Sequence, residues 1–176
     1  MDGYILKNGE RNDCRETCKP VVQLREVEVS DFPLFFRFQL DPEANQMAAF
    51  TSKDPSNREA FDRHWQKILA DQSIPIQTIL FGGQLAGSVL SYVMDGEREV
   101  SYWIGKEFWG QGVAARALAL YLDFITERPL YARAAKDNLG SFRVLEKNGF
   151  KVIATEKGFA NPRGKEIEES VLILNK

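Results

Sequence analysis

Residues 97–119 read EREVSYWIGKEFWGQGVAARALA, and this stretch predicts a strand over 98–104, a glycine-containing loop and a helix from about Val113. The first amides of a helix have no partner within the helix, and the helix dipole gives them partial positive charge. Gly110 and Gly112 have no Cβ, so an anion can approach the backbone closely. The stretch therefore predicts a cradle for an anion such as a diphosphate.

Composition limits the class of protein. The chain has 176 residues, of which 44% are hydrophobic and 27% are charged, and its formal net charge is −2. These values are ordinary for one globular domain with a sizeable core. There is no dense basic block of the kind that nucleic-acid binders carry, and no apolar run approaches the ~20 residues of a membrane helix. We expect a cytoplasmic protein with no nucleic-acid or membrane partner, either a monomer or a homodimer.

The N-terminal part of the sequence differs from the rest. Residues 1–20 are polar and lack a clear period, so they are predicted to be an extension of a single domain over 21–176. Cys14 and Cys18 lie in this extension, and His64 is the only histidine. A metal site would need two more ligands at suitable spacing, so we interpret the cysteines as free thiols and predict no metal.

The remaining pattern predicts an α+β fold. The expected elements are strand 21–29, helices 32–40 and 57–70, strands 74–81, 84–93 and 98–104, helix 113–127, strand 130–134, helix 138–147, and strands 151–155 and 167–174. Turns at 82–83 and 95–96 make the three middle strands an antiparallel meander. The strand–helix–strand unit over 98–134 adds a parallel pair to a mostly antiparallel sheet. Residues 44–52 are interpreted as a helical turn followed by a loop.

Caps and core faces follow from the same pattern. Ser30 is the predicted N-cap of the first helix, and Asn138 is the predicted N-cap of the last. Apolar spacing predicts that one helix buries Phe61, Trp65, Ile68 and Leu69, and that another buries Leu139, Phe142 and Leu145.

The element order, with a glycine loop at the central strand-to-helix junction, resembles the GNAT superfamily of acetyl-CoA-dependent N-acetyltransferases over about residues 21–174. YWIGKEFWGQGVAARAL, residues 102–118, is similar to the superfamily's strand and pyrophosphate loop. Gly112 and Ala114 match the last two fixed positions of that loop, whereas Trp109 occupies the usual Arg or Gln position.

A second block narrows the resemblance to one branch. NLGSFRVLEKNGF, residues 138–150, resembles the Asn-x-x-Ser…Leu-Glu-Lys-x-Gly-Phe block of RimJ/RimL-like ribosomal-protein N-terminal acetyltransferases. Trp-Gly-x-Gly in the loop is typical of the same branch. The two blocks lie at the separation and in the element order of that branch, so together they are a much more specific signal than a glycine loop alone.

The resemblance implies where acetyl-CoA, the expected cosubstrate, would bind. It implies helices on both faces of the sheet and a parallel pair that splays at the binding site. Backbone amides of the loop would hold the diphosphate, the central strand would pair with the pantetheine arm, and the next helix would contact the arm near the thioester. The residues implied are Tyr102, Trp103, Ile104, Gln111, Gly112, Val113, Ala114, Ala115, Asn138 and Ser141.

Acetyl transfer needs a neutral amine, which decides how strong a base is required. At pH 7 deprotonation costs about 1–1.4 kcal/mol for an α-amine and about 4.6 kcal/mol for lysine. Glu99 is the candidate base, directly or through water, and the competing interpretation is a solvated carboxylate at a strand start. Ser141 is the candidate hydrogen-bond donor to the leaving sulfur, or else only a first-turn residue. Glu168 and Glu169 are interpreted as a solvated acidic face rather than an acceptor site.

The leading hypothesis is an acetyl-CoA-dependent N-acetyltransferase that acts on a protein or peptide N-terminal α-amine. Acetylation of a small-molecule amine, such as a polyamine, an amino acid or an antibiotic, is the close alternative. A CoA-binding module without catalysis is the alternative from another class. A dinucleotide-binding oxidoreductase is disfavoured, because the loop is not a full G-x-G-x-x-G and an antiparallel meander precedes it.

Overall fold

The computed structural model describes residues 20–176, and the strands among them form one seven-stranded sheet. The strands are β1 (Val22–Glu26), β2 (Ile76–Phe81), β3 (Gln84–Met94), β4 (Glu97–Ile104), β5 (Leu130–Ala135), β6 (Lys151–Ala160) and β7 (Lys165–Leu174). Their order is β1-β2-β3-β4-β5-β7-β6, and β4–β5 is the parallel pair among antiparallel neighbours. This confirms the predicted α+β class. The extension predicted over 1–20 lies, except for Pro20, outside the described residues.

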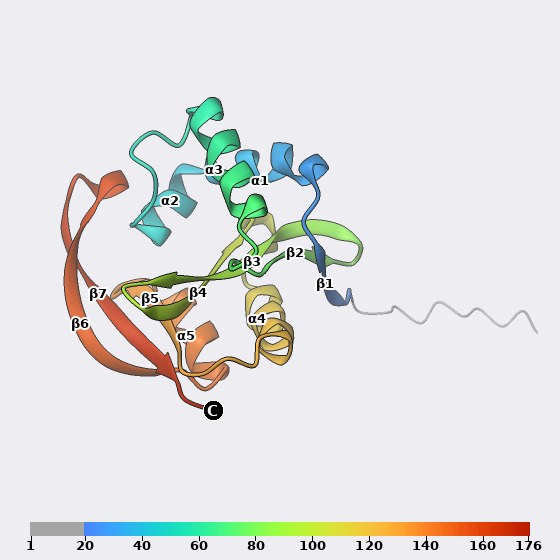
Figure 1. The fold of residues 1–176 in the computed structure, drawn as a ribbon. Coiled ribbons are helices and arrows are strands. Elements are labelled where there is room, and N and C mark those ends of the chain that lie inside the picture. Colours follow the sequence, from blue (N-terminus) through green and yellow to red (C-terminus); the bar gives the residue numbers. More distant parts are fainter. Residues whose placement is uncertain (1–19) are drawn as a thin grey trace, which may run out of the picture.

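Helices cover both faces of this sheet, as predicted (Figure 1). They are α1 (Phe32–Gln39), α2 (Pro42–Ala48), α3 (Arg58–Ala70), α4 (Val113–Phe124) and α5 (Leu139–Lys147), with 3₁₀ turns η1 (Val29–Asp31), η2 (Lys106–Phe108) and η3 (Asn161–Arg163). The first three lie on one side of the sheet, and α4 and α5 lie on the other. In the part of the chain that the structure describes, no helix is both long and apolar enough to cross a membrane.

Two predicted helix starts were wrong. The N-cap of α1 is Asp31 and not Ser30, because Asp31 is held in place by bonds from the Arg25 guanidinium, the Thr78 hydroxyl and the Glu28 N–H. Residues 42–48, expected to contribute only a helical turn, form α2. The Asp-Pro pair at 41–42 ends one helix and also begins the next, since the Asp carboxylate accepts from Ala44 N at 2.8 Å and proline is favoured in the first turn.

Predicted faces and ends also need correction. Leu69 is 37% exposed because, at about 100° per residue, it lies at the edge of the apolar stripe of α3. Leu139 is 60% exposed, since it is the first residue of α5 and lies outside the core contact. Helix α4 ends at Phe124 rather than at 127. Strand β6 runs to Ala160, whereas the predicted strand ended at 155. The prediction was too short because nearly all side chains of β6 are exposed, so the sequence has no alternating apolar pattern there.

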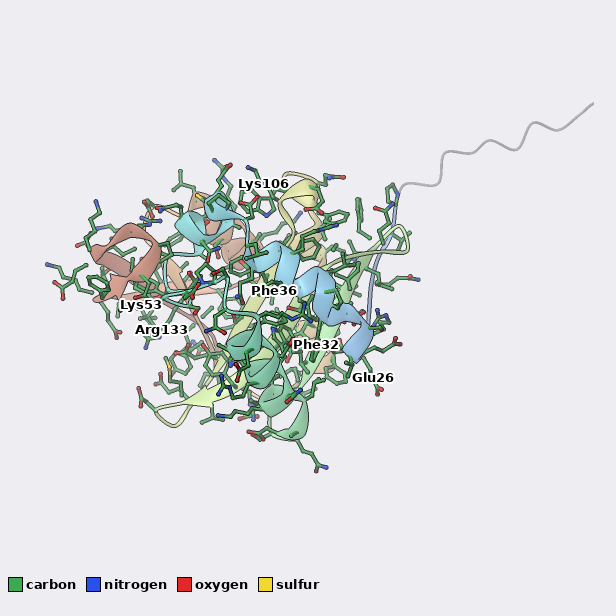
Figure 2. The ribbon with its side chains drawn as sticks, turned by 90° about the horizontal axis from the view of Figure 1, so that it is seen from above. Glu26, Phe32, Phe36, Lys53, Lys106 and Arg133 are labelled. Carbon is green, nitrogen blue, oxygen red and sulfur yellow. The ribbon has the colours of Figure 1, made fainter. Side chains whose placement is uncertain are left out.

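Each face of the sheet has its own core. On one face, α4 buries Val113, Ala117, Leu118 and Tyr121 against the central strands. On the other face, an aromatic cluster joins α1 to α3, with the Phe35 and Trp65 rings stacked at 4.6 Å between centroids. Figure 2 looks down on this second layer: Phe32 and Phe36 follow α1 across the view, and Arg133 lies on the side of the β6–β7 hairpin. The sheet is therefore covered on both sides beside its parallel pair.

Gly87 allows β3 to approach β4 closely, which gives a stability prediction. A Cβ at this position would lie 1.9 Å from the Trp103 carbonyl oxygen, which belongs to the backbone of β4. We expect Gly87→Ala to lower the free energy of unfolding by about 1–3 kcal/mol, because one of the two strands must shift. Urea unfolding followed by circular dichroism measures this loss.

Gly140→Ala is the matched control. Gly140 lies in the first turn of α5, and a Cβ there would meet Asn138 Oδ1 at an ordinary 3.6 Å. This substitution is expected to be neutral or to stabilise by up to about 1 kcal/mol, because alanine has less freedom to lose than glycine. Equal midpoints for the two variants would contradict the close-approach account of Gly87.

Candidate active site

Strands β4 and β5 separate part-way along their length. The parallel pairing recorded between them is Glu99 with Tyr131, although β4 continues well past that point. Gly105 N donates to Ala86 O at 2.8 Å, on the β3 side. Because backbone groups alternate in direction along an antiparallel ladder, Tyr102 directs its N–H and C=O to the other side, into the opening. An extended ligand that carries amides can pair with β4 at this position.

The loop between β4 and α4 has the geometry of an anion cradle. Gly110 and Gly112 have φ angles of 73° and 77°, and no atom lies within 4 Å of the position of a Cβ on either. Gly112 is the N-cap of α4, and no side chain caps the helix there, so the first backbone N–H groups of the helix can donate to an anionic ligand. Trp109 Nε1 donates to Ile104 O at 2.9 Å and so closes the loop onto the end of β4. The expected strand, loop and helix are therefore all present.

Ion pairs attach this loop to the helices on the other face of the sheet. Lys106 pairs with Glu43 of α2, and Arg37 of α1 pairs with Glu107 at 2.9 Å. The Gln111 side chain donates to Glu107 O at 2.9 Å, so this residue offers a ligand its backbone amide rather than its side chain. These contacts join the loop to α1 and α2.

Ser141 meets Tyr102 at the start of α5, beside the capping residue Asn138. Asn138 Oδ1 accepts from Ser141 N at 3.0 Å, which is the predicted cap, and Asn138 Nδ2 donates to Met47 O of α2 at 3.0 Å. The Ser141 hydroxyl lies 2.8 Å from the Tyr102 hydroxyl. Burial raises the pKa of Tyr102 to about 12, against a smaller lowering by Ser141. Two hydroxyls from different elements therefore lie together beside the opening.

Glu99 is buried, so its interpretation as a solvated carboxylate was wrong. Its exposed fraction is 2%, and it lies where β4 and β5 last pair. Arg133 Nε donates to Glu99 Oε1 at 2.8 Å, while the Tyr92 hydroxyl lies 3.4 Å from Oε2. Burial, followed by the charge of Glu99, raises the pKa of Tyr92. Both carboxylate oxygens of Glu99 therefore have a partner: Arg133 binds Oε1 closely, and the longer bond to Oε2 comes from the Tyr92 hydroxyl.

Arg133 is the residue of this region that sequence reasoning missed. Its guanidinium also bonds Glu156 and lies 3.7 Å from Glu169, so three carboxylates surround one cation. Hydrogen bonding to Glu99 is the main reason that the pKa of Arg133 is raised. Burial raises the pKa of Glu169; Arg133 opposes this effect, and Glu99 and Glu156 add to it. A charged residue inside the apolar strand β5 was the available signal.

The predicted acidic face is divided by the structure. Glu168 is exposed and pairs with Lys136 at 2.7 Å, as a solvated carboxylate would. The Glu169 side chain is only 14% exposed and belongs to the Arg133 cluster. Adjacent residues of a strand point to opposite faces, so two consecutive glutamates cannot share one environment.

The two groups of polar side chains lie on opposite faces of β4. Ala135, which points the same way as Arg133 in β5, packs with Ala49 after α2, so the Glu99–Arg133 pair is on the α1–α3 side. Tyr102 and Ser141 are on the α4–α5 side. Three residues along a strand span about 10 Å, so the two groups can meet a common ligand only in the opening between β4 and β5.

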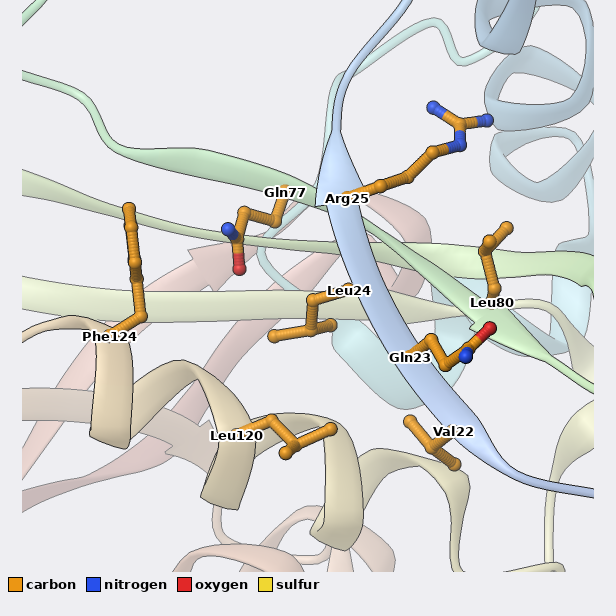
Figure 3. Close-up of a pocket in the computed structure, with 8 residues that line it drawn as sticks. All are labelled: Val22, Gln23, Leu24, Arg25, Gln77, Leu80, Leu120 and Phe124. Carbon is orange, nitrogen blue, oxygen red and sulfur yellow. The ribbon is translucent and has the colours of Figure 1, made fainter.

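Two shallow, open pockets lie away from this opening. A cavity of about 580 Å³ between β1, β2 and α4 is shown in Figure 3 and is lined by Val22, Gln23, Leu24, Arg25, Gln77, Leu80, Leu120 and Phe124. A second cavity, of about 660 Å³, borders the outer side of the loop, where Gln111 is the one predicted site residue among its described lining residues. Strand geometry and hydrogen bonding, rather than an enclosed cavity, mark the candidate site.

A helix N-terminus that is open to an anion, beside a parallel strand pair that separates, is the arrangement expected of a protein that binds coenzyme A along a strand. The chain belongs to the GNAT acetyltransferase family, because the sequence model of the acetyltransferase (GNAT) domain matches residues 22–151. It is accordingly an acetyl-CoA-dependent N-acetyltransferase, with acetyl-CoA as its cosubstrate. No curated protein matches the sequence.

Solved structures show the same fold at low sequence identity. The ribosomal α-N-protein acetyltransferase RimL in complex with coenzyme A is 20% identical, with a TM-score of 0.74 over 88% of this chain and 93% of that chain. RimJ from Mycobacterium smegmatis is 19% identical, with a TM-score of 0.73 over 88% and 81%. Spermidine N-acetyltransferase from Vibrio cholerae, in complex with CoA and spermine, is 17% identical, with a TM-score of 0.74 over 88% and 95%.

Proposed function

We propose that this N-acetyltransferase acts on the N-terminal α-amine of a protein or peptide. The observation that carries the proposal is the setting of Glu99, the candidate base, which is a single buried carboxylate with one oxygen bonded to Arg133. General-base assistance by one side chain is worth about 10²–10⁴ in rate, or about 3–5 kcal/mol. The cost of about 1–1.4 kcal/mol for an α-amine lies well within that range, whereas the 4.6 kcal/mol of a lysine-like amine uses nearly all of it.

In the proposed mechanism each group acts at a stated atom. Backbone amides from Gln111 to Ala115 bind the diphosphate, at about 1.5–3 kcal/mol for each hydrogen bond to a charged group. The backbone of β4 at 102–104 aligns the pantetheine arm. Glu99, through water, takes the proton from the amine as nitrogen attacks the thioester carbonyl carbon. Ser141 donates a hydrogen bond to sulfur as the C–S bond breaks.

Two likenesses support this choice of acceptor. RimL is named as a ribosomal α-N-protein acetyltransferase, and the Asn138–Phe150 block resembles the branch that contains it.

One feature favours a small polyamine as the second candidate acceptor. Three carboxylates surround Arg133, and their surplus negative charge would attract a polycation.

A panel of amines tests the proposal. We expect transfer of one acetyl group to the α-amine of short peptides that also carry an internal lysine, located by tandem mass spectrometry. The same peptides with a formylated N-terminus are the matched control and should remain unmodified. Spermidine and free amino acids complete the panel. Acetylation of lysine or spermidine, with the α-amine left intact, would contradict the proposed acceptor. Acetyl-CoA binding without thiol release from any amine would point to a binding module.

A further inference from the structure

The hydroxyl pair of Tyr102 and Ser141 connects β4 to the first turn of α5. The two oxygens are 2.8 Å apart, on the α4–α5 side of the opening between β4 and β5. Asn138 Oδ1 fixes the Ser141 backbone by accepting from its N–H. The Ser141 backbone is therefore anchored by its own helix, and its hydroxyl is anchored by a different element of the fold.

The number of protons on the two hydroxyls determines which one donates the bond between them. Each hydroxyl has one proton, so if Ser141 donates to a leaving sulfur, the 2.8 Å bond between the two hydroxyls must be donated by Tyr102. A phenol is the better donor of the two, and with its pKa raised to about 12 Tyr102 stays protonated at physiological pH. The other acceptor in reach, Ser141 O, is 3.5 Å away and belongs to the helix hydrogen-bond ladder. The geometry therefore suits a bond from Tyr102 to Ser141 Oγ.

We propose that Tyr102 is a positioning residue whose hydroxyl donates to Ser141 Oγ and so directs the Ser141 proton toward the sulfur of acetyl-CoA. This inference rests on the role of Ser141 in the proposed mechanism. No proton leaves Tyr102: the electron pair of the broken C–S bond stays on sulfur, and the proton lost by the amine, relayed through Glu99 and solvent, completes the CoA thiol. Without Tyr102, the Ser141 hydroxyl is free to turn back to a backbone carbonyl of the preceding turn.

A double-mutant cycle tests the inference, with the amine that the wild-type enzyme acetylates. We expect Tyr102→Phe to lower kcat about 3- to 12-fold, the value of one neutral hydrogen bond, with the KM for acetyl-CoA within about 2-fold. Ser141→Ala should lower kcat at least as much. The double variant should be no slower than Ser141→Ala, because the phenol acts only through the serine.

Tyr121→Phe is the matched control. Tyr121 is buried, whereas Tyr102 is half-buried. The pKa of the Tyr121 hydroxyl is likewise raised to about 12, and this hydroxyl donates to Pro75 O at 2.6 Å, away from the opening. Tyr121→Phe should lower the melting temperature as much as Tyr102→Phe does, while its kcat stays within about 2-fold of wild type. This comparison separates a positioning role from a loss of stability.

Three outcomes would overturn the inference. They are an unchanged kcat in either single variant, an effect on KM alone, and a loss of kcat from Tyr102→Phe that is equally large in the wild-type and the Ser141→Ala background. Failure of the proposed function has a different signature. It would be seen in the wild-type enzyme, as acetylation of amines other than α-amines, and the cycle can then still be measured with those amines.

Discussion

Gly112→Val is expected to raise the KM for acetyl-CoA by about 10²–10⁴-fold, because two hydrogen bonds to a charged diphosphate are worth about 3–6 kcal/mol. A Cβ at Gly112 would have no atom within 4 Å other than those of its chain neighbours, so crowding by the protein does not account for the expected effect. What it occupies is the approach to the first amides of α4. Initial-rate kinetics with varied acetyl-CoA, together with calorimetric binding of CoA, measure the loss.

Backbone strain must be separated from this effect, because Gly112 has a φ of 77°, which disfavours valine. Gly83→Val is the matched control: Gly83 has a φ of 81° and equally empty surroundings, but it lies in the β2–β3 turn. Both variants should lose similar stability, and only Gly112→Val should lose cofactor affinity. Equal KM values in the two variants would exclude the cradle as the diphosphate site.

Glu99→Gln is expected to lower kcat about 10²-fold or more below the pH optimum, if Glu99 is the base. Glutamine keeps an oxygen for Arg133 and removes the negative charge. The deficit should shrink as pH rises through the amine pKa of about 7.7–8.0, because the acceptor then loses its proton to solvent without help. A pH profile of kcat from about 6 to 9 with an α-amine substrate should show the kcat of the variant approaching that of the wild type as pH rises.

Glu156→Gln provides the comparison for this result. Glu156 bonds the same guanidinium, but its side chain is 52% exposed and it lies on the outer hairpin. We expect kcat within about 2-fold of wild type at every pH, since an exposed ion pair contributes little. A Glu99→Gln deficit of constant size across pH would instead assign Glu99 the structural role of holding Arg133.

Local sequence signals predicted the features that arise within a few residues. The space beside Gly110 and Gly112 is open, as expected for glycines without a Cβ, and Asn138 caps α5 with a bond only three residues away. Apart from α2, the order of helices and strands was correct, and the strand–helix–strand unit over 98–134 correctly predicted the parallel pair. The weakest local predictions were α2 and β6, where the start of a helix resembled a break and exposed side chains left no period.

What the tertiary structure alone decided is which side chains meet at the opening. Arg133 reaches Glu99 across 34 residues of sequence, and Tyr102 reaches Ser141 across 39. No spacing rule connects such positions, because their contact depends on how β4, β5 and α5 pack around one another. The sequence by itself determined the cradle at residues 110–112, since backbone angles and helix caps are local. Only the packing of β4 against β5 shows that Glu99 is a buried partner of Arg133 and not an exposed carboxylate at a strand end.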